Sequence, residues 1–139
     1  MKKLIVFDLD GTLVDSIGDI ADAVNRSLAQ LGIMPHPKAS YYKMVGDGME
    51  MLCRRALGDE NAAQLTQLVA LYRADYLKNC CEKTKPYPGI LELLTEIKEK
   101  GMMTAIISNK PQEQTQRVVT EILGAARFDR VFGKREEYP

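Results

Sequence analysis

The stretch that most constrains the fold lies at the start of the chain, where a short apolar run leads directly into two carboxylates. Residues 4–7 read Leu-Ile-Val-Phe, and Asp-Leu-Asp-Gly-Thr-Leu follows at residues 8–13. The apolar run is too short to span a membrane, and its continuous, β-branched composition predicts a strand buried on both faces of a parallel sheet. Asp8 and Asp10 then fall at the carboxyl end of that strand, where open α/β sheets bind ligands.

These two carboxylates are close enough to act together. Side chains alternate along an extended segment, so Asp8 and Asp10 point the same way while Leu9 points into the fold. Two neighbouring carboxylates repel each other unless a cation lies between them or one keeps its proton. The spacing therefore predicts a divalent-metal site with a nucleophile and an acid/base. A solvated acidic turn is the alternative, and Asp-x-Asp alone does not exclude it.

The composition limits the class of protein. The chain has 139 residues, of which 45% are apolar and 27% charged, so we expect one globular domain or a core with a small insertion. Nineteen basic residues balance nineteen acidic ones, which gives no support to a nucleic-acid or anionic-membrane partner. We find no signal-peptide or transmembrane pattern, and the three cysteines lack metal-type spacing. A cytoplasmic location is expected.

The middle of the chain is predicted to be helical. Apolar residues recur at helical spacing through residues 17–82 with no strand signal, which predicts an all-α insertion between two parts of an α/β core, residues 1–16 and 83–139. Inside the insertion, Gly46-Asp47-Gly48 leads directly into a helix that contains Arg54 and Arg55. Such a loop can present backbone N–H groups to an anion or can simply be a turn. Both arginines are interpreted as surface-exposed helix residues, and contact with an anionic substrate is the alternative.

A second apolar run precedes another polar cluster. Residues 102–107 predict a buried strand that ends in Ser108-Asn109-Lys110-Pro111. A hydroxyl, an amide and a cation at a strand's carboxyl end can form a phosphate cradle, with Pro111 at the first position of a helix over residues 111–123. An ordinary turn is the alternative. A third short strand is predicted around residues 128–132.

Residues 8–16, Asp-Leu-Asp-Gly-Thr-Leu-Val-Asp-Ser, resemble the first motif of the haloacid dehalogenase superfamily, and most closely that of its phosphoglycolate-phosphatase branch. Ser108 corresponds to the second motif, and the segment around Gly46-Asp47-Gly48 resembles the cap segment that helps select the substrate. The resemblance implies an α/β fold with a Rossmann-like parallel core and a helical cap inserted after the first strand. Here the core would be incomplete.

The resemblance also implies a reaction and its residues. It implies Mg²⁺-dependent hydrolysis of a small phosphorylated metabolite, such as phosphoglycolate, with Asp8 as the nucleophile that forms an aspartyl-phosphate. The Asp8 carboxylate and the Asp10 main-chain carbonyl would bind Mg²⁺, and the Asp10 carboxylate would act as acid and base. The implied phosphate-binding residues are Gly11, Thr12, Ser108, Asn109 and Lys110. The implied specificity loop is Gly46, Asp47 and Gly48. A sugar phosphomutase of the β-phosphoglucomutase type and a non-catalytic phosphate- or metal-binding module are the alternatives.

Part of the family pattern is missing. The third-motif lysine and the fourth-motif acidic residues follow the third core strand in this family, and the sequence stops where the third motif would begin. Without the strand that comes later, residues 4–7 would form an apolar sheet edge, which is a template for pairing between chains. We therefore expect either a homodimer through this edge or a truncated enzyme with weak or no activity.

Overall fold

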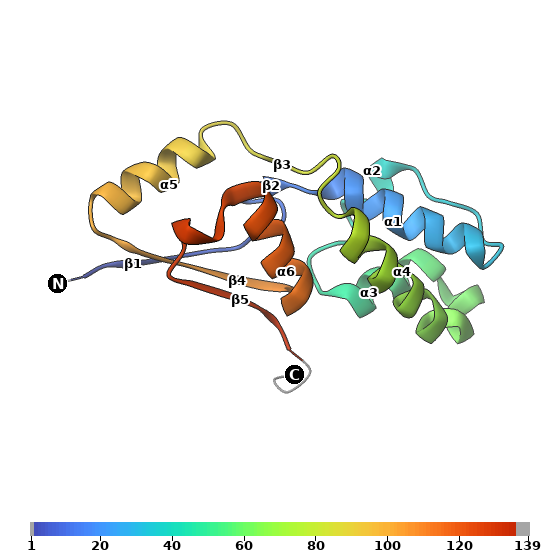
Figure 1. Ribbon diagram of the computed structural model, residues 1–139. Helices are drawn as coiled ribbons and strands as arrows, with labels where there is room; N and C mark the ends of the chain where they lie inside the picture. The colour runs from blue at the N-terminus through green and yellow to red at the C-terminus, as the bar shows by residue number, and fades with distance from the viewer. Residues whose placement is uncertain (1, 136–139) are drawn as a thin grey trace.

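The computed structural model describes residues 2–135, in which a parallel sheet lies beside a lobe of helices (Figure 1). The strands of the main sheet follow the order β1-β4-β5, and both neighbouring pairs are parallel. Their bounds are β1 Leu4–Phe7, β4 Met103–Pro111 and β5 Arg130–Lys134. This architecture confirms the predicted α/β class with a helical insertion after the first strand. No helix among the described residues is long and apolar enough to cross a membrane.

The helical lobe packs around its own apolar core. Its elements are α1 Ile17–Gln30, α2 Lys38–Tyr41, α3 Met49–Leu57, the 3₁₀ helix η1 Asp59–Gln64 and α4 Leu65–Asn79. The helical stretch from residue 59 is divided into η1 and α4, and Asn61 has non-helical backbone angles inside η1. Leu28, Tyr41, Leu68 and Tyr76 are 0% exposed in this core. The domain boundaries at residues 16/17 and 82/83 stay predictions.

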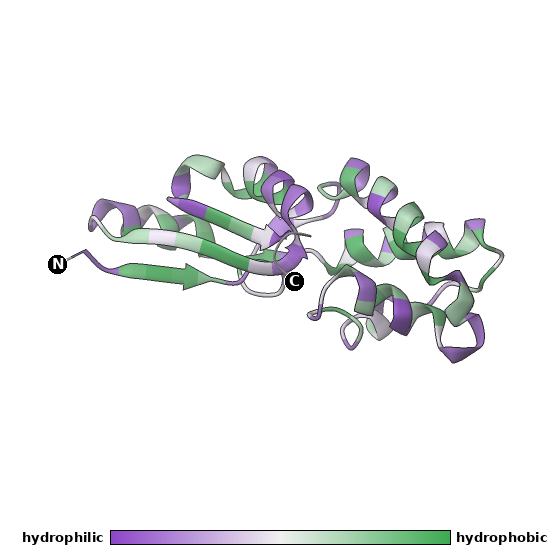
Figure 2. Ribbon diagram, turned by 90° about the horizontal axis from the view of Figure 1, so that it is seen from below, coloured by the Kyte–Doolittle hydropathy of each residue, from purple (hydrophilic) through white to green (hydrophobic). Residues whose placement is uncertain are grey.

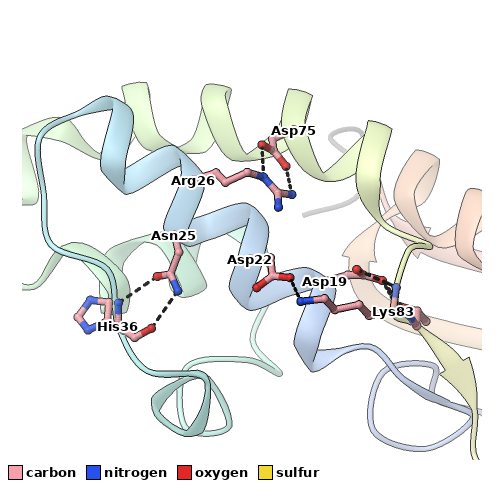
Figure 3. A network of polar contacts seen from close by, with 8 residues as sticks. Asp19, Asp22, Asn25, Arg26, His36, Asp75 and Lys83 are labelled. Atoms are coloured by element: carbon pink, nitrogen blue, oxygen red, sulfur yellow. Dashed lines mark hydrogen bonds and ion pairs between the residues drawn. The ribbon is translucent and has the colours of Figure 1, made fainter.

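The two crossings between the lobe and the sheet are paired with each other. β2 Val14–Asp15 and β3 Lys85–Pro86 form a short antiparallel ladder, which the sequence did not indicate because two residues per strand are too few for a pattern. Asp19 strengthens this joint from α1 (Figure 3). Its 2%-exposed carboxylate accepts the Lys83 N–H at 2.9 Å, the Thr84 N–H at 2.8 Å and the Thr84 hydroxyl at 2.6 Å.

Further polar contacts in Figure 3 fasten α1 to its neighbours inside the lobe. Arg26 on α1 donates two hydrogen bonds to Asp75 on α4, at 2.7 and 2.9 Å. The Asn25 side chain bonds both the N–H and the C=O of His36. The His36 ring in turn contacts the Ala56 carbonyl at 2.7 Å. The loop after α1 is therefore held against two helices.

The main sheet is covered on one face. α5 Ile90–Glu99 and α6 Gln112–Val118 connect successive strands in the same direction along the sheet. Right-handed connections of this kind place both helices on the same face. α6 continues as a π-helical turn, Val119–Leu123, and the 3₁₀ turn Ala125–Arg127 precedes β5. Among residues 2–135, no helix lies over the opposite face, which is turned toward the viewer in Figure 2.

That opposite face is apolar. Its large hydrophobic side chains are 39–57% exposed, and we call the face that they form the bare face: Leu4, Val6, Met103, Ile107 and Phe132. The prediction that residues 4–7 are buried on both faces is therefore wrong, because α5 and α6 cover only the other side. Within residues 2–135, β1 pairs with β4 alone and so forms the sheet edge that the family resemblance led us to expect.

Candidate active site

The loop that follows β1 brings two carboxylates to one cavity. Leu9 is buried, while Asp8 and Asp10 line a cavity of about 140 Å³ between the sheet and the lobe. The loop closes on itself, because the Leu9 carbonyl accepts N–H groups from Leu13 and Val14. The alternation predicted for residues 8–10 is therefore present. Within residues 2–135 the Asp8 carboxylate has no hydrogen-bond or ion-pair partner, so it is available to a ligand.

Asp10, in contrast, is held by two side chains. Its Oδ1 accepts a hydrogen bond from the Ser16 hydroxyl at 2.6 Å and lies 2.9 Å from Lys110 Nζ. Ser16 occupies the N-cap position of α1. Its hydroxyl makes no capping bond and binds Asp10 instead. Both partners contact the same carboxylate oxygen, Oδ1, and together they restrict the orientation of the Asp10 side chain.

Lys110 links the sheet to the helical lobe. Its side chain is 5% exposed, and its ammonium group donates to the Tyr76 hydroxyl and lies 4.5 Å from the centre of the Tyr76 ring. Tyr76 stacks on Tyr72, with ring centres 5.4 Å apart. Burial, reinforced by the charge of Asp10, raises the pKa of Tyr76 well above its ordinary value. The ammonium predicted to bind phosphate is therefore bound to Asp10 and to a neutral phenol in this structure.

The end of β4 supplies a hydroxyl and a tether. The Ser108 hydroxyl lines the cavity and accepts the Lys110 N–H at 3.1 Å, which leaves its own proton available for a phosphoryl oxygen. Asn109 donates to the Gly46 carbonyl at 3.0 Å and so fastens β4 to the lobe. β4 runs four residues beyond its predicted end, with a register shift between Ile107 and Pro111.

The predicted specificity loop divides between the cavity and the surface. Gly46 and Gly48 line the cavity with φ angles of +116° and +92°, which favour glycine. Asp47 is not among the lining residues and pairs with Arg55 at 2.6 Å. Arg55 also donates to the Met44 carbonyl at 3.0 Å. Asp47 therefore shapes the loop from outside.

Gly11 and Thr12 have their backbone donors occupied. The Gly11 N–H bonds the Val14 carbonyl at 3.0 Å, and the Thr12 N–H bonds the Leu9 carbonyl at 3.2 Å. Gly11 lines the cavity, whereas Thr12 is not among its lining residues. Phosphate binding by these two residues stays a prediction, and it requires the loop bonds to open or to be shared.

The oxygen ligands present match the preferences of Mg²⁺. Residues 2–135 contain no group of three or more His, Cys, Asp or Glu side chains that could enclose a metal ion. Mg²⁺ rarely needs such a cage, since it keeps several waters and commonly uses one or two carboxylates together with substrate phosphate oxygens. The unpartnered Asp8 carboxylate is a ligand of this kind. The Asp10 carboxylate, already bound by Ser16 and Lys110, is less available.

Sequence reasoning missed the residues that reach the site from the lobe. Tyr72 and Tyr76 belong to the apolar stripe of α4, and a helix core explains such a stripe equally well. Their role beside Lys110 depends on how α4 packs against the end of β4. No local pattern in the sequence reports that packing.

Comparison with known proteins agrees with this architecture. Residues 5–137 match the haloacid dehalogenase-like hydrolase family. A phosphoglycolate phosphatase of Aquifex aeolicus is 35% identical over 131 residues, covering 94% of this chain and 60% of that protein. One from Mannheimia succiniciproducens is 36% identical over 143 residues, covering 95% and 61%. The chain thus spans about three-fifths of the length of these relatives.

Solved structures show the same fold. The crystal structure of a predicted phosphoglycolate phosphatase from Haemophilus somnus aligns with a TM-score of 0.88 at 28% identity, covering 95% of this chain and 62% of that one. A putative phosphoglycolate phosphatase from Lactobacillus delbrueckii aligns with a TM-score of 0.87 at 26% identity. With the family match over residues 5–137, these findings show that the chain belongs to the haloacid dehalogenase-like hydrolases.

Proposed function

We propose that this chain carries the phosphoryl-transfer site of a Mg²⁺-dependent phosphatase that hydrolyses a small phosphomonoester. The observation that supports this most directly is the meeting of Asp8, Asp10 and Ser108 in one cavity. Asp8 and Asp10 follow β1, and Ser108 lies in the C-terminal half of the adjacent parallel strand β4, so all three are near the carboxyl ends of these strands. The names of the curated relatives make phosphoglycolate the first substrate to assay.

The proposed reaction proceeds in two displacements. An Asp8 carboxylate oxygen attacks phosphorus in line, and the bond to the ester oxygen breaks as the aspartyl-phosphate forms. Protonated Asp10 gives its proton to the departing alkoxide and then removes a proton from water. That water attacks phosphorus, releases inorganic phosphate and regenerates the Asp8 carboxylate. Ser16 and Lys110 hold Asp10 in orientation for both proton transfers.

The remaining groups stabilise charge. The Ser108 hydroxyl is available to donate to a phosphoryl oxygen, and such a donor is most effective where charge develops in the transition state. The Asp8 carboxylate and the Asp10 main-chain carbonyl would hold Mg²⁺. When bound, the metal would supply positive charge beside the anionic nucleophile and the phosphoryl oxygens.

The test measures phosphate release from a chromogenic phosphomonoester in the presence of Mg²⁺. Asp8→Asn should abolish release, because the amide cannot form the phosphoenzyme, and a chelator should do the same. Asp59→Asn is the matched control, since Asp59 is exposed at the start of η1, away from the cavity lining. Release that survives Asp8→Asn would refute the mechanism.

Two other outcomes identify the alternative functions. Interconversion of sugar phosphates without net phosphate release would indicate a phosphomutase. Mg²⁺-dependent binding of vanadate in calorimetry, without turnover and lost in Asp8→Asn, would indicate a phosphate-binding module.

A further inference from the structure

The cavity has two chemically different sides. The sheet supplies its reactive side, with Asp8 and Asp10 from the loop after β1 and Ser108 from β4. The lobe supplies a largely apolar wall: Ile17, Ile20, Val45, Met49, Leu52 and the Tyr72 side chain. A phosphoryl group seated against Asp8 would direct its ester group toward the lobe. The wall therefore contacts the alcohol part of the substrate.

Charge on the cavity lining is unevenly distributed. Within the described part of the chain, residues 2–135, three acidic residues line it, Asp8, Asp10 and Asp15, against a single basic residue, Lys110. The Lys110 ammonium is already within bonding distance of Asp10 and Tyr76. Among residues 2–135, no cationic side chain lining the cavity is left for a second anionic group of the substrate.

The arginines nearest in sequence to the apolar wall do not change this balance. Arg54 and Arg55 belong to α3, the helix that also contributes Met49 and Leu52, but neither lines the cavity. Arg55 is occupied by Asp47 and the Met44 carbonyl. Arg54 pairs with Glu50 on the same exposed helix surface, with an N–O distance of 3.0 Å.

We propose that this site selects phosphate esters of small, uncharged and largely apolar alcohols over esters whose alcohol carries a carboxylate. This rests on the proposed phosphatase function and narrows its substrate class. A carboxylate placed against Ile20 or Leu52 would lose its hydration without gaining a cationic partner, whereas an alkyl group would bury apolar surface. The cavity volume of about 140 Å³ favours a small alcohol. The preferred substrate would thus differ from the one in the names of the relatives.

The test compares two phosphonates that cannot be hydrolysed and that have nearly the same shape. 3-Phosphonopropionate mimics phosphoglycolate, and 3-methylbutylphosphonate carries an isopropyl group in place of the carboxylate. Calorimetric titration of the full chain with Mg²⁺ should show tighter binding of the methylbutyl compound, by roughly 10- to 200-fold. Equal affinities would overturn the proposal. Tighter binding of the carboxylate would overturn it too and would point to the backbone N–H groups at the start of α3.

A second test introduces a positive charge into the apolar wall. Val45 is half-buried in the loop before α3, so Val45→Lys can place an ammonium group at the wall without opening the lobe core. We expect Val45→Lys to reverse the order of affinities, while Val45→Met, of similar length and without charge, keeps it. An unchanged order in Val45→Lys, with wild-type circular dichroism, would contradict the proposed wall.

Vanadate binding separates this proposal from the function on which it rests. If vanadate binds with Mg²⁺ while the phosphonates do not differ, the substrate class is wrong and the phosphate site stands. If neither vanadate nor either phosphonate binds, the phosphate site and the substrate class both fail.

Discussion

The helical lobe buries most of its large apolar side chains, whereas the main sheet leaves many of its own exposed. The lobe closes around its own core, in which Leu28 and Leu68 are fully buried, whereas the sheet leaves Leu4 and Ile107 more than half exposed. Helices close to one another in sequence can surround a core with local contacts. A parallel sheet needs covering layers on both faces. The helices within residues 17–79 therefore enclose the core of the lobe, while α5 and α6 cover only one of the two faces of the sheet.

The largest contrast should appear when the same substitution is made in both regions. Leu28→Ala removes a fully buried side chain from the lobe core and should lower the free energy of unfolding by about 2–5 kcal/mol. Leu4→Ala, on the bare face with its side chain 57% exposed, should cost less than about 1 kcal/mol. Urea unfolding followed by far-UV circular dichroism measures both. Equal losses would mean that the bare face is covered in solution.

The joint between the two regions should have the next largest effect. Asp19→Ala removes the acceptor for the Lys83 and Thr84 N–H groups and should cost roughly 1–3 kcal/mol. It should also broaden the urea transition, because the lobe and the sheet would no longer unfold together. Asp22→Ala is the matched control. It breaks only an exposed ion pair with Lys83 and should leave the transition sharp.

The exposed sheet can be tested by measuring whether two chains associate through it. The homodimer expected from the sequence remains a proposal, and the exposed edge of β1 together with the bare face supports it. Sedimentation velocity should show a concentration-dependent dimer, and Val6→Lys should weaken it about tenfold or more, equivalent to roughly 1.4 kcal/mol. Met34→Lys, in an exposed loop of the lobe, should have no effect. A wild-type chain that stays monomeric at all concentrations would refute the dimer.

The difference between the two regions also explains how much of the fold the sequence predicts. Apolar runs and helical spacing are local signals, so the strands near residues 4–7 and 102–107 and the helical insertion were all predicted. The exposure of Leu4 and Val6 was not evident from their own composition. Whether a strand is covered on one face or two depends on the direction of its connections, which are remote in sequence.

The candidate site and the joint between the lobe and the sheet show the same difference between local and distant signals. Asp8, Asp10 and Ser108 were predicted from residues that lie next to each other in the chain. The contacts of Lys110 with Tyr76, and of Asp19 with Lys83 and Thr84, join residues that are 34, 64 and 65 positions apart. Polar side chains select such distant partners only after the elements have packed, so a single sequence gives no signal for them.

The smallest expected effect concerns an ion pair inside the lobe and appears only at acidic pH. Hydrogen bonds from Arg26 hold the pKa of Asp75 below its ordinary value of 3.8. The pair therefore stabilises the folded state above that value, and this contribution is lost as pH falls through the lowered pKa. Because Arg26 is partly exposed, we expect no more than about 1 kcal/mol.

In urea titrations at a series of pH values, Asp75→Asn should be less stable than wild type at pH 7. The difference should shrink below about pH 4, where protonated Asp75 resembles the amide. A difference that stays constant down to pH 2, or one that matches Asp59→Asn on the lobe surface, would show that Arg26 and Asp75 contribute nothing to the closure of the lobe.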